Sequence, residues 1–234
     1  MDADSTVAPG GDRASTRCNC KQMALAAGIR PQWGAMHSEV TLEIANTAAR
    51  MVVEEGREWG PAKKRAVKQL GLPARTALPD NDVLEAAVRE YIELFCGDTQ
   101  PAELQALREW ALLWMERMQS FRPHLSGAVW NGTATRLSDI YIQLFCDDPK
   151  SAEIALIDHG VRYDASSITG FHGDTVEALS ISSFCQPLGE AVGVHYLIYD
   201  ADDLRGALKP DAKGRAQRGS LDSLRRLLAE ASHD

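Results

Sequence analysis

The residues best suited to chemistry in this sequence lie close together, between positions 125 and 145. Two glycines, Gly127 and Gly132, interrupt the stretch, and Asp139 stands at the start of an apolar segment that we expect to be a strand. A glycine lets the backbone approach a phosphate closely, and the helix start expected after Gly132 would offer N–H groups to an anion. A carboxylate at the mouth of the next strand could hold a divalent cation that bridges those phosphates. The pattern therefore favours a site for a phosphate-bearing ligand.

The same stretch resembles the nucleotidyltransferase superfamily, which includes the DNA-polymerase-beta-like and minimal nucleotidyltransferases. The family pattern is an apolar residue, Gly-Ser, a basic stretch, Gly-Thr-Ala and then Ser-Asp-x-Asp on a strand. Gly127 falls on the first glycine, Gly132-Thr133-Ala134 on the second turn, and Ser138-Asp139 on the start of the metal-binding strand. The resemblance implies a short mixed sheet flanked by helices. It also implies Mg²⁺, held by two or three carboxylates, for transfer of a nucleotidyl group from a nucleoside triphosphate.

The resemblance assigns roles to individual residues. A bound nucleotide would contact a set of cofactor-binding residues: Gly127, Ala128, Gly132, Thr133 and Ser138. Asp139 would be a catalytic residue and metal ligand, and the family's third carboxylate, which lies on a later strand, would be Glu177. Because Mg²⁺ binds oxygen ligands at about 2.0–2.1 Å, we expect the carboxylates of Asp139 and Glu177 to lie roughly 4–6 Å apart.

Two positions depart from the family pattern. Ala128 stands where a serine is expected, which removes a hydroxyl contact to phosphate, and Tyr141 stands at the position of the second aspartate. Residues two apart on a strand share a face, so the side chains at 139 and 141 would point at the same metal ion. A phenol with a pKa of about 10 is not a Mg²⁺ ligand at neutral pH. We therefore expect an incomplete magnesium site.

The incomplete site predicts a nucleotidyltransferase-like protein that binds a nucleotide or another anion, with weak or no transferase activity. The alternative is a non-catalytic interaction or regulatory module that binds through its helical half. A third class is a DNA-binding regulator, in which Lys63-Lys64-Arg65 and Lys68 face a nucleic-acid backbone. The chain has 25 Lys and Arg against 33 Asp and Glu, a net charge of -8, which argues against nucleic acid as a partner.

The chain also resembles a group of bacterial proteins labelled UDP-N-acetylmuramate–alanine ligase. Segments 76–81, 121–130 and 202–210 carry this resemblance. A muramyl ligase resembles a three-domain ATPase with a Gly-x-x-Gly-Lys-[Ser/Thr] loop, and no such loop occurs in this sequence. We therefore do not expect ligation.

Hydrophobic periodicity predicts an α+β fold in which an N-terminal helical module precedes a small mixed sheet with flanking helices. Residues 1–36 are small, polar and turn-rich, and we interpret them as a disordered tail, with Met36 as the true start. Residues 37–121 carry apolar side chains at helical spacing, in four helices that begin near His37, Pro61, Asn81 and Pro101. Trp110 and Trp114 share one face of the fourth helix and should be core residues.

In the second half of the chain, the spacing of apolar residues changes from that of helices to that of strands. Residues 122–207 form the predicted nucleotidyltransferase-like α+β domain, with strands over 125–130, 140–146, 176–184 and 192–199. Residues 208–234 form a basic loop followed by a helix over 221–231. The hexapeptide Tyr141–Cys146 nearly repeats Tyr91–Cys96, but the flanking sequences differ, which argues against a true internal repeat.

Composition limits the remaining function classes. Apolar residues make up 44% of the 234 residues, enough for a sizeable core, and no apolar run approaches the length of about 18 that a membrane helix needs. The start of the chain has no basic segment followed by an apolar one, so we expect no secretory signal. The five cysteines are odd in number and scattered, unlike a disulfide framework. We therefore expect a cytoplasmic protein with reduced thiols.

Overall fold

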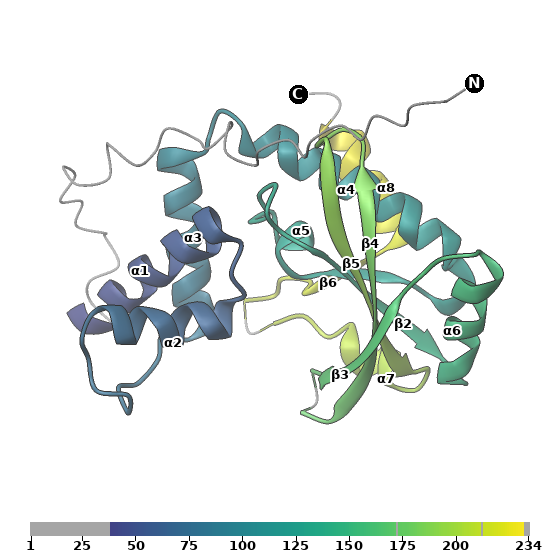
Figure 1. Cartoon of the computed structure of the whole chain (residues 1–234), viewed down its shortest axis with the longest axis horizontal. Coiled ribbons are helices and arrows are strands. Elements are labelled where there is room, and N and C mark those ends of the chain that lie inside the picture. Colours follow the sequence, from purple (N-terminus) through teal and green to yellow (C-terminus); the bar gives the residue numbers. More distant parts are fainter. Residues whose placement is uncertain (1–37, 172, 212, 232–234) are drawn as a thin grey trace, which may run out of the picture. The chain divides into compact units, whose positions relative to one another are not determined.

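A computed structural model describes residues 38–171, 173–211 and 213–231, and it shows a mixed α+β architecture (Figure 1). A helical N-terminal region is followed by a six-stranded mixed sheet with helices around it. The predicted fold class is confirmed at this level. The predicted tail over 1–36, together with Met36, lies outside the described residues.

Three helices open the described chain: α1 (Glu39–Glu55), α2 (Trp59–Gln69) and α3 (Asn81–Phe95). Local sequence explains their ends. The Ser38 hydroxyl accepts a hydrogen bond from the Thr41 N–H at 3.2 Å, and Gly56 ends α1 in the left-handed region at φ 64°. The Asp80 carboxylate accepts from the Val83 N–H at 2.8 Å and caps α3. The three helices bury a common core of their own.

Helix α4 (Gln100–Arg117), which we expected to belong to the same helical module, packs on the sheet instead. Its buried residues, Leu107, Ala111, Trp114 and Met115, join the core of the second half rather than that of α1–α3. The predicted helical module over 37–121 is thus divided between two hydrophobic cores.

The sheet has the strand order β3-β4-β5-β2-β1-β6. Its strands are β1 (His124–Ser126), β2 (Ile140–Cys146), β3 (Asp164–Thr169), β4 (Thr175–Cys185), β5 (Glu190–Asp200) and β6 (Arg218–Ser220). Strands β2 and β5 are parallel, and the other neighbouring pairs are antiparallel. The intervening helices are η2 (Gln119–Phe121), α5 (Gly127–Asn131), α6 (Pro149–Asp158), α7 (Asp203–Ala207) and α8 (Leu221–Ala231).

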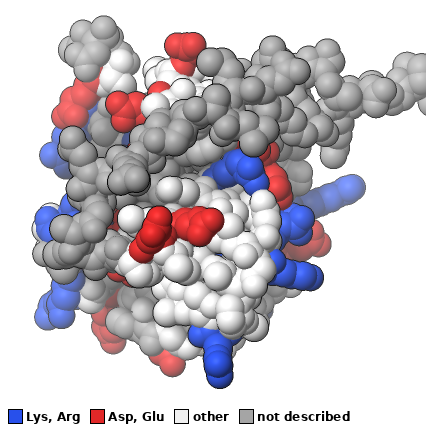
Figure 2. All heavy atoms as spheres, turned by 90° about the vertical axis from the view of Figure 1, so that its left-hand side faces the viewer, with Lys and Arg blue, Asp and Glu red and all other residues white. Residues whose placement is uncertain are grey.

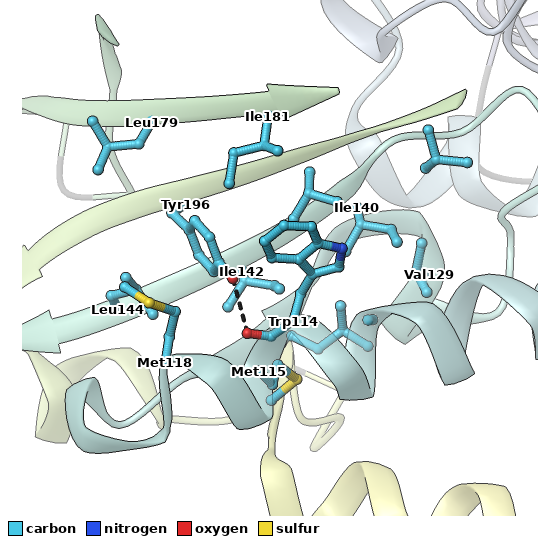
Figure 3. Close-up of a cluster of buried hydrophobic side chains, with 14 of the residues drawn as sticks. Trp114, Met115, Met118, Val129, Ile140, Ile142, Leu144, Leu179, Ile181 and Tyr196 are labelled. Carbon is cyan, nitrogen blue, oxygen red and sulfur yellow. Dashed lines mark hydrogen bonds between the residues drawn. The ribbon is translucent and has the colours of Figure 1, made fainter. Parts of the chain in front are cut away.

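One face of the sheet carries the main core. Helices α4 and α8 pack on each other and on this face, and side chains from β2, β4 and β5 meet them there. Tyr196 is fully buried, and its hydroxyl donates a hydrogen bond to the Trp114 carbonyl at 2.8 Å (Figure 3). Trp114 is buried, as predicted, and Trp110 is partly buried against the same core. The opposite face of the sheet is less apolar, and it holds the groups considered below.

Three strands differ from the prediction: β1 is shorter, and β3 and β6 lie where no strand was expected. The strand expected over 125–130 ends at Ser126, because Gly127 takes a left-handed conformation at φ 71° and the chain continues as helix α5. Strand β3 was not predicted, because it lies at the edge of the sheet and its mostly exposed residues show no alternation of apolar and polar types. Edge strands often lack a buried face, so their sequences carry little periodic signal.

Candidate functional site

Asp139 and Glu177, the predicted metal ligands, lie toward opposite ends of the sheet. Glu177 is in register with Ile198 on β5, and Ile198 with Leu144 on β2. Position 144 lies five residues beyond Asp139, a distance of roughly 16 Å along a strand, in addition to the two strand spacings that separate β4 from β2. Glu177 instead accepts a hydrogen bond from Lys150 Nζ at 3.4 Å. The prediction of a magnesium site shared by Asp139 and Glu177 is therefore wrong.

The group that lies beside Asp139 is an imidazole. His195 Nε2 is 3.4 Å from Asp139 Oδ2, and the Gly193 N–H donates to Asp139 Oδ1 at 3.1 Å. Hydrogen bonding from His195 holds the pKa of Asp139 below its ordinary value, against the opposing effect of burial. Gly193 allows the carboxylate to lie this close to the backbone, because a Cβ at this position would lie 2.5 Å from Asp139 Oδ1.

A row of polar side chains crosses this face in register. It runs through Ser180 on β4, His195 on β5, Tyr141 on β2 and Ser126 on β1. Ser180 Oγ is 2.8 Å from His195 Nδ1, and the rings of His195 and Tyr141 stack with centroids 4.9 Å apart. No function was predicted for Ser180 or His195 from the sequence. Their position in the sequence gives one indication. Each lies between two buried residues of its strand, and because side chains alternate along a strand, both point to the face opposite the main core.

Tyr141 connects this face to the helical region. Its hydroxyl donates a hydrogen bond to Glu58 Oε1 at 3.0 Å, and Glu58 immediately precedes α2. Burial, followed by the nearby Glu58 carboxylate, raises the pKa of the Tyr141 phenol well above its ordinary value. The phenol is therefore neutral at physiological pH and supplies no negative charge to a cation.

The residues around Asp139 do not fit a two-carboxylate magnesium site. The strand positions nearest to Asp139 on this face belong to β2 and to its parallel neighbour β5. Tyr141 occupies the nearest such position on β2, and Gly193 and His195 occupy the nearest ones on β5. Among residues 38–171, 173–211 and 213–231, no group of three His, Cys, Asp or Glu side chains gathers closely enough to hold a metal ion.

Both predicted glycines lie in turns, but the helix start expected after Gly132 is wrong, because α5 ends at Asn131 and no helix begins between Gly132 and β2. Gly127 and Gly132 both have positive φ, 71° and 82°. Arg89 Nη2 donates to the Asn131 carbonyl at 2.6 Å, and Arg108 Nε donates to the Val129 carbonyl at 3.1 Å. These guanidinium groups satisfy carbonyls at the end of α5, where positive charge is favourable.

The other predicted cofactor-binding residues differ in their accessibility. Thr133 is buried, with only 2% of its surface exposed, and Ser138 Oγ accepts a hydrogen bond from the Thr135 N–H at 3.0 Å. Ser138 therefore stabilises the turn, and the Thr133 side chain is buried away from a ligand in solution. Ala128 is half-buried in the first turn of α5, directly after the Ser126–Gly127 corner beside Tyr141.

A pocket of about 290 Å³ adjoins the end of this turn. It is lined by residues from the helices, from α5 and from the loop before β6: Trp59, Asn81, Asp82, Glu85, Asn131, Asp211, Lys213, Arg215 and Gln217. Asn131 is the last residue of α5, so the pocket borders the predicted glycine turn directly.

Ion pairs cross this pocket. Arg215 contacts Glu85 at 2.9 Å, Asp82 at 3.2 Å and Asp211 at 2.9 Å, and Lys213 contacts Asp82 at 2.9 Å. The side chains of Lys213 and Arg215 remain 56% and 40% exposed, so both cations are open to solvent while they pair with carboxylates. Lys213 and Asp82 are both exposed, and an exposed pair of this kind contributes little to stability. The Glu85 and Asp211 side chains that pair with Arg215 are only 9% and 19% exposed.

Charged side chains of both signs are scattered over the described surface that Figure 2 shows. Among the described residues, no helix is both long and apolar enough to span a membrane.

Comparison with known proteins gives no match: no family model fits the sequence, and neither a curated protein nor a solved structure is similar to it.

Proposed function

We propose that this chain is a nucleotidyltransferase-like protein that binds a nucleotide, or another phosphate-bearing ligand, without transferring the nucleotidyl group. The observation that carries the proposal is the pocket beside Asn131, at the end of the glycine turn, into which the C-terminal loop brings Lys213 and Arg215. Phosphates are recognised by such ammonium and guanidinium groups.

The pocket supports binding of part of a nucleotide. Small-molecule sites commonly measure about 300–1,000 Å³, so a pocket of about 290 Å³ suits the phosphates and sugar better than a whole nucleotide. The indole of Trp59 lies at its wall, together with the amide side chains of Asn81 and Gln217. A phosphate would replace Asp82 as the partner of Lys213, so binding is a competition between ligand and carboxylates and should weaken with salt.

The residues on the polar face of the sheet argue against nucleotidyl transfer. In-line nucleotidyl transfer by two metal ions needs carboxylates that bridge both ions. Asp139 is held by Gly193 and His195, and Tyr141 beside it is neutral. The strand positions next to Asp139 carry Tyr141, Gly193 and His195, so neither β2 nor β5 supplies a second carboxylate there.

Calorimetric titration of ATP into the full chain, at about 50 mM and about 300 mM salt, tests the proposal. We expect binding at low salt, a loss of about tenfold in affinity in Lys213→Ala, and no release of pyrophosphate. Lys150→Ala is the matched control, because Lys150 is also exposed and paired, but with Glu153 and Glu177 on another part of the surface. An absence of binding, or equal losses in both variants, would contradict the proposal.

A second candidate function is a non-catalytic interaction module, and helix α6 favours it. Ile154 and Ile157 lie one turn apart on α6 and are 54% and 58% exposed. Contiguous exposed apolar patches mark contact surfaces, and these two side chains would form the centre of such a patch on α6. Light scattering of the full chain and of Ile157→Asp would test this candidate: an assembly that the substitution dissociates would support it, and a monomer in both cases would oppose it.

A further inference from the structure

Ser180, His195 and Asp139 form a chain of hydrogen-bonding groups that the nucleotide proposal does not use. None of the three lines the pocket beside Asn131. A carboxylate can only accept, so the contact of Asp139 with His195 Nε2 places the imidazole proton on that nitrogen. His195 Nδ1 then carries the lone pair and accepts from the Ser180 hydroxyl, 2.8 Å away. This is the order of groups that activates a serine as a nucleophile.

Three contacts hold the imidazole of His195 in this orientation. The ring of Tyr141 stacks on it with an interplanar angle of 24°, and the Tyr141 hydroxyl is itself fixed by Glu58. Gly193 has no side chain to crowd the contact between Asp139 and His195. A Cβ at this position would lie 3.0 Å from His195 Nε2. The side chain of His195 is still 23% exposed, so a small substrate can reach the relay.

We propose that this relay makes Ser180 a metal-independent nucleophile toward carboxylic esters. Ser180 Oγ attacks the carbonyl carbon and its proton passes to His195 Nδ1. The bond to the leaving alkoxide then breaks, and the alkoxide takes that proton from His195. Water next loses a proton to His195 and attacks the acyl group, and Ser180 Oγ leaves and recovers the proton. The net reaction converts ester and water into acid and alcohol.

The negative charge of this face argues for a neutral substrate. Glu58 and Asp139 both lie near Tyr141 on this face, and their negative charges would repel an anionic phosphate. A neutral ester carbonyl meets no such repulsion. The relay therefore takes a different ligand from the one proposed for the pocket beside Asn131.

Covalent labelling of the full chain with a fluorophosphonate probe, followed by mass spectrometry of its peptides, tests the relay. We expect the probe to modify Ser180, at a rate that falls about a hundredfold in His195→Gln, because general-base assistance contributes roughly 10²–10⁴-fold. Ser182→Ala is the matched control, since Ser182 is an exposed serine two residues along the same strand, and it should leave the rate unchanged. No label on Ser180, or the same rate in His195→Gln, would overturn the proposal.

A second variant tests the relay independently, in case His195→Gln fails to fold. In Ser180→Cys the thiol should be alkylated by iodoacetamide at least about tenfold faster than in the double variant that also carries His195→Gln, because the imidazole favours the thiolate. The peptide that contains position 180 separates this signal from that of the native cysteines. Equal rates in the two variants would overturn the proposal independently of the fluorophosphonate result.

Discussion

Tyr141 and His195 lie in register on the parallel strands β2 and β5, with their rings stacked at 4.9 Å. They occupy the positions next to Asp139 at which a metal-dependent nucleotidyltransferase would need further carboxylates. The phenol is neutral and the imidazole is engaged by Asp139 and Ser180. Tyr141 and His195 thus explain why nucleotidyl transfer is not expected. His195 also leaves this face of the sheet with an imidazole that can accept and return a proton.

Gly193→Ala should disrupt this arrangement. The new Cβ would lie 2.5 Å from Asp139 Oδ1 and 3.0 Å from His195 Nε2, so the contact between carboxylate and imidazole must change. Overpacking of this kind costs about 1–3 kcal/mol of unfolding free energy, measured by urea denaturation. Gly60→Ala in α2 is the control, because among the described residues no atom lies within 4 Å of the Cβ it would add. Equal stability of the two variants would show that Asp139 is not confined.

Trp114→Ala should remove a large part of the main core. Trp114 is only 5% exposed and packs edge to face against Tyr196. Truncating a buried tryptophan costs about 3–5 kcal/mol. Trp110→Phe should cost much less, because Trp110 is only partly buried and its Nε1, which is buried, has no hydrogen-bond partner among the described residues. Melting temperatures of the two variants check this order, and an unchanged value for Trp114→Ala would refute its burial.

Stability should fall in mild acid because of His124. Burial lowers the pKa of His124 below its ordinary value of 6.5. The unfolded chain therefore binds a proton below about pH 6.5 that the folded chain does not, and the free energy of unfolding decreases as pH falls from there toward the lower folded pKa. Urea denaturation across this range should show a smaller pH dependence in His124→Gln. His159→Gln, at an exposed position, is the control and should keep the wild-type slope.

Tyr141→Asp should increase affinity for Mg²⁺. The substitution places a second carboxylate two residues from Asp139 on the same face of β2, and carboxylate oxygens are ligands that Mg²⁺ accepts. Calorimetric titration with MgCl₂ compares the variant with the unmodified chain. Tyr141→Asn, which lacks the added charge, is the control. If Tyr141→Asp binds no better than Tyr141→Asn, the missing charge at 141 is not what limits metal binding.

Local sequence predicted most helices and strands well where capping residues or clear periodicity were present. Asp80 and Gly56 mark helix ends in the structure as they do in the sequence, and the alternation over 140–146 marks β2. The near-repeat of six residues shows the limit of such signals, because Tyr91–Phe95 end helix α3 whereas Tyr141–Cys146 form strand β2. Tertiary context decides between the two states for so short an apolar segment.

The composition of the site could not be predicted because it depends on strand order. Glu177 was the expected partner of Asp139, since it lies on a later strand, but β4 is separated from β2 by β5. His195 is adjacent to Asp139 only because β5 pairs with β2 in parallel and in that register. Nothing in the spacing of residues along the chain fixes such a pairing, which arises from the packing of the whole sheet.

Photoaffinity labelling with the γ-azidoanilide of ATP, whose reactive group is attached to the terminal phosphate, followed by peptide mapping of the full chain, tests the central claim most directly. The indole of Trp59 and the basic residues Lys213 and Arg215 line the pocket beside Asn131. The proposal predicts saturable adducts on peptides that contain Trp59 or residues 211–217, and their loss when unmodified ATP is added in excess. Adducts confined to other peptides, or adducts that excess ATP does not displace, would contradict the claim that this pocket binds a nucleotide.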